Sequence, residues 1–187
     1  MGSSSVPHVT SLESRVQRLE DRFAINDLIV RYAVLLDDML FEEVGQLFTE
    51  DGVFASPNSR TVGRQAIVDN FRVKHEPFGM TLHDPHGSAI FFIDDEQARG
   101  TVLGYAELAN EQHTIVTNIR YQDDYRKEDG VWRFASRHVL SVYGMTVDDF
   151  NAGRAGREQR KIWPNRPAGD AELPDKKQKY PGYVELP

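Results

Sequence analysis

The second half of the chain constrains the fold most, because it contains four strand-like segments in direct succession. They span residues 88–93, 98–109, 113–126 and 131–143. Short polar turns separate them, the clearest being Glu128-Asp129-Gly130. Strands joined by such short turns pair in antiparallel order. This half therefore predicts an antiparallel meander.

The first half predicts helices instead. A long helical pattern covers residues 9–40, a short one covers 41–48, and a third covers 63–78, with a short strand at 53–56. Helices that precede a run of strands indicate an α+β fold. We expect a strongly curved antiparallel sheet packed on the N-terminal helices.

The predicted domain organisation is one domain with two extensions. Residues 1–8 are Gly/Ser-rich and are expected to be disordered or added in cloning. Residues 9–145 form the α+β domain. Residues 146–187 are rich in Pro, Gly and charged residues, which predicts an extended tail that lies on the surface or reaches a neighbouring subunit.

Composition excludes several classes of function. The net charge of −7 argues against a general nucleic-acid binder and against binding to an anionic membrane. No apolar run approaches the roughly 20 residues of a membrane-spanning helix. The chain has no cysteine, so disulfides and thiolate chemistry are excluded, and a cytoplasmic location is expected.

The end of the first helix carries the first candidate site. Apolar residues recur at helical spacing from Ile25 to Leu36, and Tyr32 lies on this stripe, followed by Asp37 and Asp38. A carboxylate at the C-terminus of a helix faces the negative end of the helix dipole. Either these aspartates are solvated loop residues, or a pocket partner holds one of them in place.

The histidines supply the other titratable candidates. His83 and His86 flank Pro85, so they cannot share a helical face, and on a strand they would point to opposite sides. A metal site is therefore not expected. His138 alternates in phase with Trp132 on a face that we expect to be interior. His8, His75 and His113 are expected at the surface.

Familiar catalytic motifs are absent from the sequence. There is no Gly-x-Ser-x-Gly, P-loop, dinucleotide fingerprint or zinc pattern, so no cofactor is expected. The candidates that remain are aromatic, amide, carboxylate and imidazole side chains: Tyr32, Asp37, His83, His86, Tyr105, Glu107, Asn118, Tyr121, Tyr125, Trp132 and His138.

An ordered set of short motifs between residues 19 and 143 adds a family resemblance. The set comprises Arg31-Tyr32, Asp37, Leu47-Phe48-x-x-Asp51-Gly52, Gly63 with Ile67 and Phe71, His83, Asp94 with Ala98, Tyr121 with Tyr125, and Asp129-Gly130-x-Trp132-Arg133-Phe134. In this order the motifs resemble SnoaL-like proteins of the nuclear-transport-factor-like cone superfamily. The resemblance implies a cone-shaped sheet that encloses a deep apolar pocket.

The resemblance also implies roles for individual residues. Dehydratase-like and dehydrochlorinase-like members place a Tyr and an Asp on the first helix and a His on the facing strand, which match Tyr32, Asp37 and His83. His83 would be the general base, with His86 as the alternative. Tyr32 would donate a hydrogen bond, and His138 would be a second acid.

The implied function is a cofactor-free lyase, either a dehydratase or a related elimination catalyst, which includes formaldehyde-releasing cleavage of a lignin-derived aromatic dimer. The substrate would be a small hydrophobic, cyclic or phenolic compound. The expected substrate-binding residues are His86, Tyr105, Glu107, Asn118, Tyr121, Tyr125 and Trp132. An isomerase or cyclase, or a non-catalytic binding or dioxygenase small-subunit-like protein, is the alternative. A homodimer or homotrimer is expected.

Overall fold

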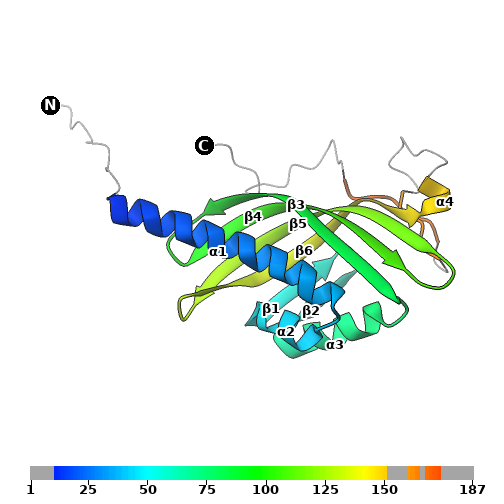
Figure 1. Cartoon of the computed structure of the whole chain (residues 1–187), viewed down its shortest axis with the longest axis horizontal. Coiled ribbons are helices and arrows are strands. Elements are labelled where there is room, and N and C mark those ends of the chain that lie inside the picture. The colour runs from blue at the N-terminus through cyan, green and yellow to red at the C-terminus, as the bar shows by residue number, and fades with distance from the viewer. Residues whose placement is uncertain (1–10, 151–159, 165–166, 174–187) are drawn as a thin grey trace.

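The computed structural model describes residues 11–150, 160–164 and 167–173. Three helices and two short strands come first, and four long strands follow (Figure 1). The elements are α1 (Leu12–Asp37), α2 (Phe41–Gln46), β1 (Phe48–Ser56), β2 (Ser59–Val62), α3 (Arg64–His75), β3 (Met80–Phe92), β4 (Gln97–Ala109), β5 (Thr114–Glu128), β6 (Val131–Thr146) and α4 (Val147–Phe150).

The six strands form one curved, unclosed sheet in the order β2-β1-β6-β5-β4-β3. The predicted meander is confirmed, because β3, β4, β5 and β6 pair in antiparallel order. β1, however, pairs with β6 in parallel, so the sheet is mixed rather than wholly antiparallel. Parallel partners need a long crossover, and here α3 and the meander together provide it.

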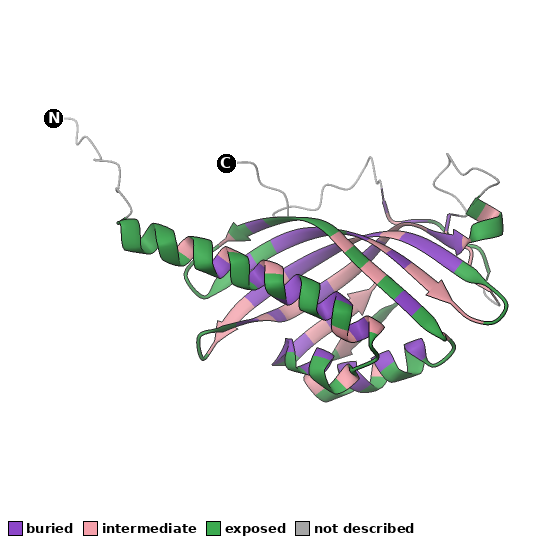
Figure 2. Ribbon diagram, viewed as in Figure 1, coloured by how far each residue is buried: buried purple, intermediate pink, exposed green. Residues whose placement is uncertain are grey.

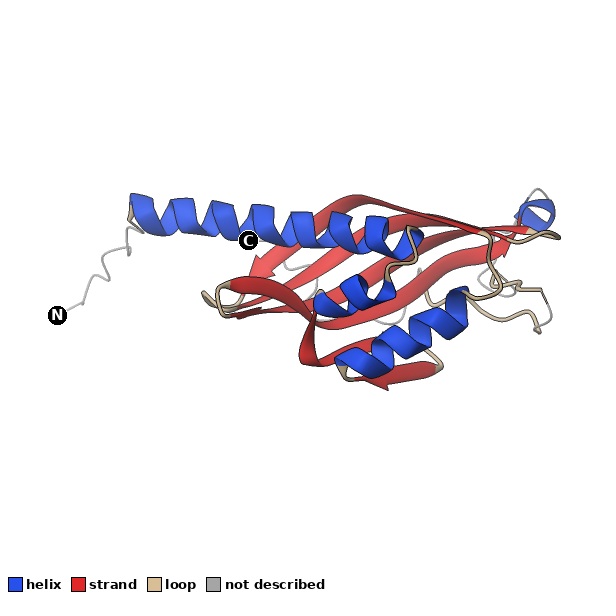
Figure 3. Cartoon of the chain, turned by 60° about the horizontal axis from the view of Figure 1, so that its bottom comes forward, coloured by secondary structure: helices blue, strands red, loops and turns tan. Residues whose placement is uncertain are grey.

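The helices α1, α2 and α3 cover one face of the sheet (Figure 3). The predicted apolar stripe of α1 is confirmed, since Ile25, Leu28, Tyr32 and Leu36 are all buried. The Tyr32 ring packs edge-on against Phe134 at 5.7 Å between ring centroids. Helices and sheet therefore share one apolar core, as the α+β prediction requires.

Several features differ from the predicted elements, and one of them is that β1 begins at Phe48 rather than at residue 53. β3 begins at Met80 rather than at residue 88, and neither β2 nor α4 was predicted. The strand register of β3 shifts between Pro85 and Gly87. This bulge interrupts the alternation of polar and apolar residues, so periodicity alone could not extend the strand to Met80.

Part of the C-terminal region lies against the domain itself. The Gly144 amide donates to the Arg160 carbonyl at 2.8 Å, and the Leu173 amide donates to the Ser141 carbonyl at 3.1 Å. β1 pairs with β6 only as far as His138, so these residues cover β6 beyond that point. Covering an exposed strand edge in this way prevents it from pairing with other chains.

Other predictions about the ends of the chain fall outside the described residues. Residues 1–8 are in this group, as are residues 151–159, 165–166 and 174–187 of the predicted tail. Within the described part of the chain, no helix is long and apolar enough to cross a membrane.

Candidate functional site

Asp37 is the last residue of α1, and the chain turns sharply directly after it. The Met39 amide bonds the Leu36 carbonyl at 3.1 Å, and the Leu40 amide bonds the Leu35 carbonyl at 2.9 Å. Met39 takes the left-handed φ of +57° that this type of helix ending requires. The turn ends the helix with the Asp37 side chain directed toward β3.

β3 supplies the partners that hold Asp37 in place. One carboxylate oxygen accepts from the Thr81 hydroxyl at 3.0 Å and contacts His83 Nδ1 at 2.6 Å. The other accepts from the His83 amide at 2.7 Å. Both side chains are largely buried, with 17% of Asp37 and 13% of His83 exposed. These three contacts outweigh the unfavourable helix dipole and favour the pocket interpretation of Asp37 over the solvated one.

The contacts also determine the tautomer of His83. Burial raises the pKa of Asp37, but the hydrogen bonds from His83 and Thr81 outweigh burial and bring the pKa below 3.8. An ionised carboxylate can only accept hydrogen bonds, so Nδ1 of His83 carries a proton. In the neutral imidazole Nε2 is then unprotonated and able to accept a proton.

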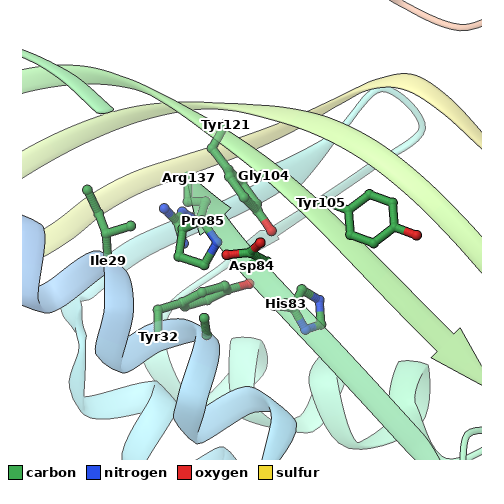
Figure 4. A pocket seen from close by; sticks show the side chains of 10 residues that line it. Ile29, Tyr32, His83, Asp84, Pro85, Gly104, Tyr105, Tyr121 and Arg137 are labelled. Atoms are coloured by element: carbon green, nitrogen blue, oxygen red, sulfur yellow. The ribbon is translucent and has the colours of Figure 1, made fainter. Parts of the chain in front are cut away.

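A cavity lies next to this pair, between α1 and the sheet (Figure 4). Its volume is about 10 Å³, which is room for about one water molecule. Aromatic and charged side chains fill the space where a deep pocket was expected. The lining residues are Ile29, Tyr32, Ala33, His83, Asp84, Pro85, Gly104, Tyr105, Tyr121 and Arg137.

Arg137 and Asp123 form a buried ion pair at the wall of this cavity. The guanidinium donates to both carboxylate oxygens, at 3.0 and 2.8 Å, and the two side chains are 1% and 0% exposed. Tyr125 donates to the same carboxylate at 2.8 Å. Burial lowers the pKa of Arg137, but Asp123 outweighs it and keeps this side chain a permanent cation. The sequence analysis missed both charged residues.

The guanidinium of Arg137 lies over two of the cavity's aromatic rings, Tyr32 at 4.3 Å and Tyr121 at 4.1 Å. Burial raises the pKa of Tyr32 well above 10 and that of Tyr121 to about 12. Both phenols therefore stay protonated near neutral pH and can donate hydrogen bonds.

His138 does not reach the cavity, so the expectation of an interior His138 is wrong. The β5–β6 register shifts by one residue between the pairs Asp124–Ser136 and Tyr125–Phe134. A one-residue bulge moves every later side chain to the opposite face. Arg137 therefore lines the cavity in place of His138, whose charged neighbour is Glu172 of the C-terminal region.

The two candidate bases of β3 are separated in the same way. His83 lies against Asp37, whereas His86 is exposed at the bulge, with its Nδ1 3.3 Å from the Asp84 carbonyl oxygen. Of the two imidazoles, the structure brings only His83 to the carboxylate.

Three expected substrate-binding residues lie on the sheet face that points away from α1. Tyr105 and Glu107 alternate with the buried Gly104 and Ala106, and the Tyr105 hydroxyl donates to Glu107 at 3.1 Å. Asn118 pairs with Tyr105 across the strands and shares this face. Tyr105 contacts the edge of the cavity, but its ring lies apart from Tyr32 and Tyr121 (Figure 4).

Tyr125 and Trp132 are core residues and do not line the cavity. Tyr125 bonds Asp123, as described above. The Trp132 indole donates to Asp21 at 2.9 Å, and Lys127 contacts the same carboxylate at 2.6 Å. These two contacts fix the middle of α1 to β5 and β6.

His75 is buried next to the site, so its predicted surface location is wrong. Its ring lies 6.3 Å from the His83 ring, and its Nδ1 lies 2.9 Å from the Phe71 carbonyl oxygen. Burial lowers the pKa of His75 below 6.5. His75 ends α3, and only the packing of α3 against the sheet places it there.

A second hollow of about 130 Å³ opens between α1 and β3. Ile29 and Pro85 line both this hollow and the small cavity. On its wall, the Ser88 hydroxyl donates to the side-chain amide oxygen of Asn26 at 2.7 Å. Among the described residues, no group of three or more His, Cys, Asp or Glu side chains is placed to hold a metal ion.

Comparison with models of protein families identifies the family of this chain. The model of the SnoaL-like domain matches residues 17–138. The chain belongs to the SnoaL-like family. The match includes every strand of the meander and ends within β6, so the SnoaL-like domain contains both Asp37 and His83.

Solved structures share the fold of this SnoaL-like protein. A provisionally assigned scytalone dehydratase from Novosphingobium aromaticivorans is similar at 24% identity and a TM-score of 0.66, covering 70% of this chain and 90% of its own. A type 2 hexachlorocyclohexane dehydrochlorinase has 20% identity and a TM-score of 0.68, with coverage of 72% and 93%. A provisionally assigned aromatic ring hydroxylase from Novosphingobium aromaticivorans has 22% identity and a TM-score of 0.65, with coverage of 70% and 96%. No curated protein matches the sequence.

Proposed function

We propose that this SnoaL-like protein is a cofactor-free lyase that removes water, or a comparable leaving group, from a small cyclic or phenolic compound. The observation that carries the proposal is the 2.6 Å contact between Asp37 and His83 Nδ1 beside a cavity wall that holds Tyr32. Similar folds in proteins described as a dehydratase and a dehydrochlorinase support the elimination class.

The proton transfer follows from the charges of the pair. Nε2 of His83 accepts a proton from substrate carbon, and the electron pair of the broken C–H bond forms the new double bond. The bond to the leaving oxygen breaks as the double bond forms, and that oxygen departs as water with a proton from the Tyr32 phenol, which the His83 imidazolium restores, or directly from the His83 imidazolium. Asp37 stabilises the imidazolium that forms, and a placed general base contributes roughly 10²- to 10⁴-fold to the rate.

Two side chains support the proposal, because each could stabilise negative charge in the transition state. The Tyr32 phenol is buried and protonated, and the Arg137 guanidinium lies over its ring at 4.3 Å. Fixed donors in a dry site stabilise developing charge more strongly than water does. Tyr32 therefore either binds an oxygen next to the reacting carbon or protonates the leaving group.

Substrate binding requires the two hollows to join. The cavity beside His83 holds about one water, and its neighbour of about 130 Å³ is close to the size that holds a benzene ring, about 150 Å³. Ile29 and Pro85 separate the two. A shift of α1 against β3 at these residues would admit one ring, which supports a small cyclic substrate. Formaldehyde-releasing cleavage of a lignin-derived dimer would use the same base. The base would then remove the proton of a substrate hydroxyl group instead of a proton on carbon.

The small volume of the cavity favours a second candidate function. A site filled by Tyr32, Tyr121 and Arg137 is what a non-catalytic member of the same fold would have. Such a protein would bind a small molecule in the neighbouring hollow or act as a subunit. An isomerase or a cyclase would use the same Asp37–His83 base, but its reaction would release no leaving group.

Turnover by point variants on a panel of alicyclic and phenolic alcohols tests the proposal. His83→Ala and Asp37→Asn should lose at least 100-fold in kcat/KM, because each removes part of the base. His86→Ala should stay within about 2-fold of the parent. The formation of unsaturated product and the release of formaldehyde are followed separately, so that the two reactions can be distinguished.

Two results would contradict the proposal. No turnover by the parent protein on any panel member, together with ligand binding in the Asn26–Ser88 hollow, would favour the binding function. Turnover that His83→Ala leaves unchanged would remove the proposed base.

A further inference from the structure

The outer face of α1 carries a second apolar stripe. Leu12, Val16, Leu19 and Phe23 are all exposed, with Leu12 and Phe23 exposed by 73% and 69%. They follow one another at intervals of four, three and four residues. This is the seven-residue repeat of a coiled-coil contact line, in which the first and fourth positions of each heptad are apolar.

The stripe lies opposite the face that α1 buries on the sheet. The buried residues Asp21, Ile25, Leu28 and Tyr32 fall on the far side of the helix from Leu19 and the rest of the outer stripe at 100° per residue. A surface helix that packs only on its own domain needs a single apolar face. Within the described part of the chain, the fold of one copy therefore does not require the outer stripe.

The position of α1 leaves this stripe accessible. The first turns of the helix project beyond the end of the sheet (Figures 1 and 3), and they are exposed almost all round (Figure 2). Arg18 donates to Asp94 and Asp95 at 2.9 Å from the sheet side of the helix, so it holds the projecting part in place without covering the stripe.

Charged residues border the stripe at the same seven-residue interval. Glu13, Glu20 and Asp27 follow one side, and Arg15 and Arg22 follow the other. In a parallel pair of helices, charged residues beside the core positions meet across the contact. The residue just before one core position of the first helix lies beside the residue just after the next core position of the second helix. Arg15 would then meet Glu20 of the second copy, whereas Arg22 donates to the Ile90 carbonyl of its own β3 at 3.1 Å. In an antiparallel pair, acidic residues would meet acidic residues and basic would meet basic.

We propose that the outer face of α1 binds the same face of a second copy of this chain, forming a parallel two-helix contact. The apolar repeat gives the contact its core, and the acidic and basic borders complement each other only in the parallel arrangement. The two sheets then lie on opposite sides of the helix pair, with both Asp37–His83 sites facing away from the contact. The interface is separate from the proposed reaction and does not depend on it.

Sedimentation velocity of the full chain across about 1–100 µM tests the contact. Phe23→Glu places a charge on the largest exposed side chain of the stripe and should raise the dimer dissociation constant at least 10-fold. Val73→Glu is the matched control, since Val73 is equally exposed, at 74%, on α3. The control should sediment as the parent does. A parent protein that is monomeric at all concentrations, or an unchanged Phe23→Glu variant, would overturn the proposal.

Cross-linking tests the direction of the helices, because the chain contains no cysteine. In a parallel pair Leu19 of each copy faces Leu19 of the other, so Leu19→Cys should form a disulfide-linked dimer on mild oxidation. Val73→Cys should not. Loss of assembly in Phe23→Glu without cross-linking of Leu19→Cys would overturn the parallel arrangement. Glu20→Arg should weaken the dimer, and adding Arg15→Glu should restore it.

Discussion

Two aspartates each bind a residue that lines the same cavity, and these partners, His83 and Arg137, give the two carboxylates different roles. Asp123 is fully buried against Arg137 and Tyr125, a cation and a donor that keep their protons near neutral pH. Asp37 is partly exposed and is paired with Nδ1 of His83, an imidazole whose second ring nitrogen does not bond this carboxylate. The two carboxylates therefore differ in the chemistry of their partners as well as in burial. The imidazole partner of Asp37 indicates a candidate base, and the guanidinium partner of Asp123 indicates a structural ion pair.

Removing the Asp123 charge should have the largest effect on stability. Asp123→Asn leaves the buried Arg137 guanidinium without its counter-charge, and breaking a buried pair in this way costs about 3–5 kcal/mol. Urea unfolding followed by circular dichroism measures the loss. The double variant Asp123→Leu/Arg137→Met should recover most of it, because an apolar pair of similar volume replaces two buried charges. A loss below about 1 kcal/mol in Asp123→Asn would remove the contrast between the two aspartates.

Asp37→Asn should cost less stability, about 1–2 kcal/mol at pH 7, because the amide oxygen still accepts from Thr81 while the charge is lost. The folded-state pKa of Asp37 is lowered, so its contribution is present above about pH 3.8 and is lost as the pH falls through the folded-state value. Below pH 4 the parent should therefore lose stability more steeply than Asp37→Asn. Acid unfolding curves of the two proteins give this difference, and parallel curves would contradict it.

The smallest predicted effect concerns His75, which lies next to His83. Burial lowers its folded-state pKa below the ordinary 6.5, so the unfolded chain takes up a proton first as the pH falls. His75 therefore contributes a loss of stability below about pH 6.5, with a slope of up to about 1.4 kcal/mol per pH unit. His75→Gln should flatten the dependence of the melting temperature on pH between 6.5 and 5. His113→Gln, at an exposed turn, should leave the parent slope unchanged, and an equal effect of both variants would exclude a specific role for burial.

Much of the fold could be predicted because its signals are local. The apolar stripe from Ile25 to Leu36 and the turn at Glu128-Asp129-Gly130 involve only neighbours in sequence, and they indicate α1 and the meander. The pairing of β1 with β6 could not be predicted, because it joins Phe48 to Phe134 across the whole meander. The buried position of His75 could not be predicted for the same reason, because it depends on how α3 packs against the sheet.

The sequence by itself determined the long first helix, the antiparallel meander and the apolar stripe that turns Tyr32 toward the sheet, whereas the orientation of Asp37 came from its contacts with β3. Only the tertiary structure decided which charged residue of β6 enters the cavity. One extra residue in the β5–β6 pairing brings Arg137 inside and sends His138 out, because side chains alternate with a period of two. No local pattern shows where such a bulge falls, since the pairing of two whole strands sets its position.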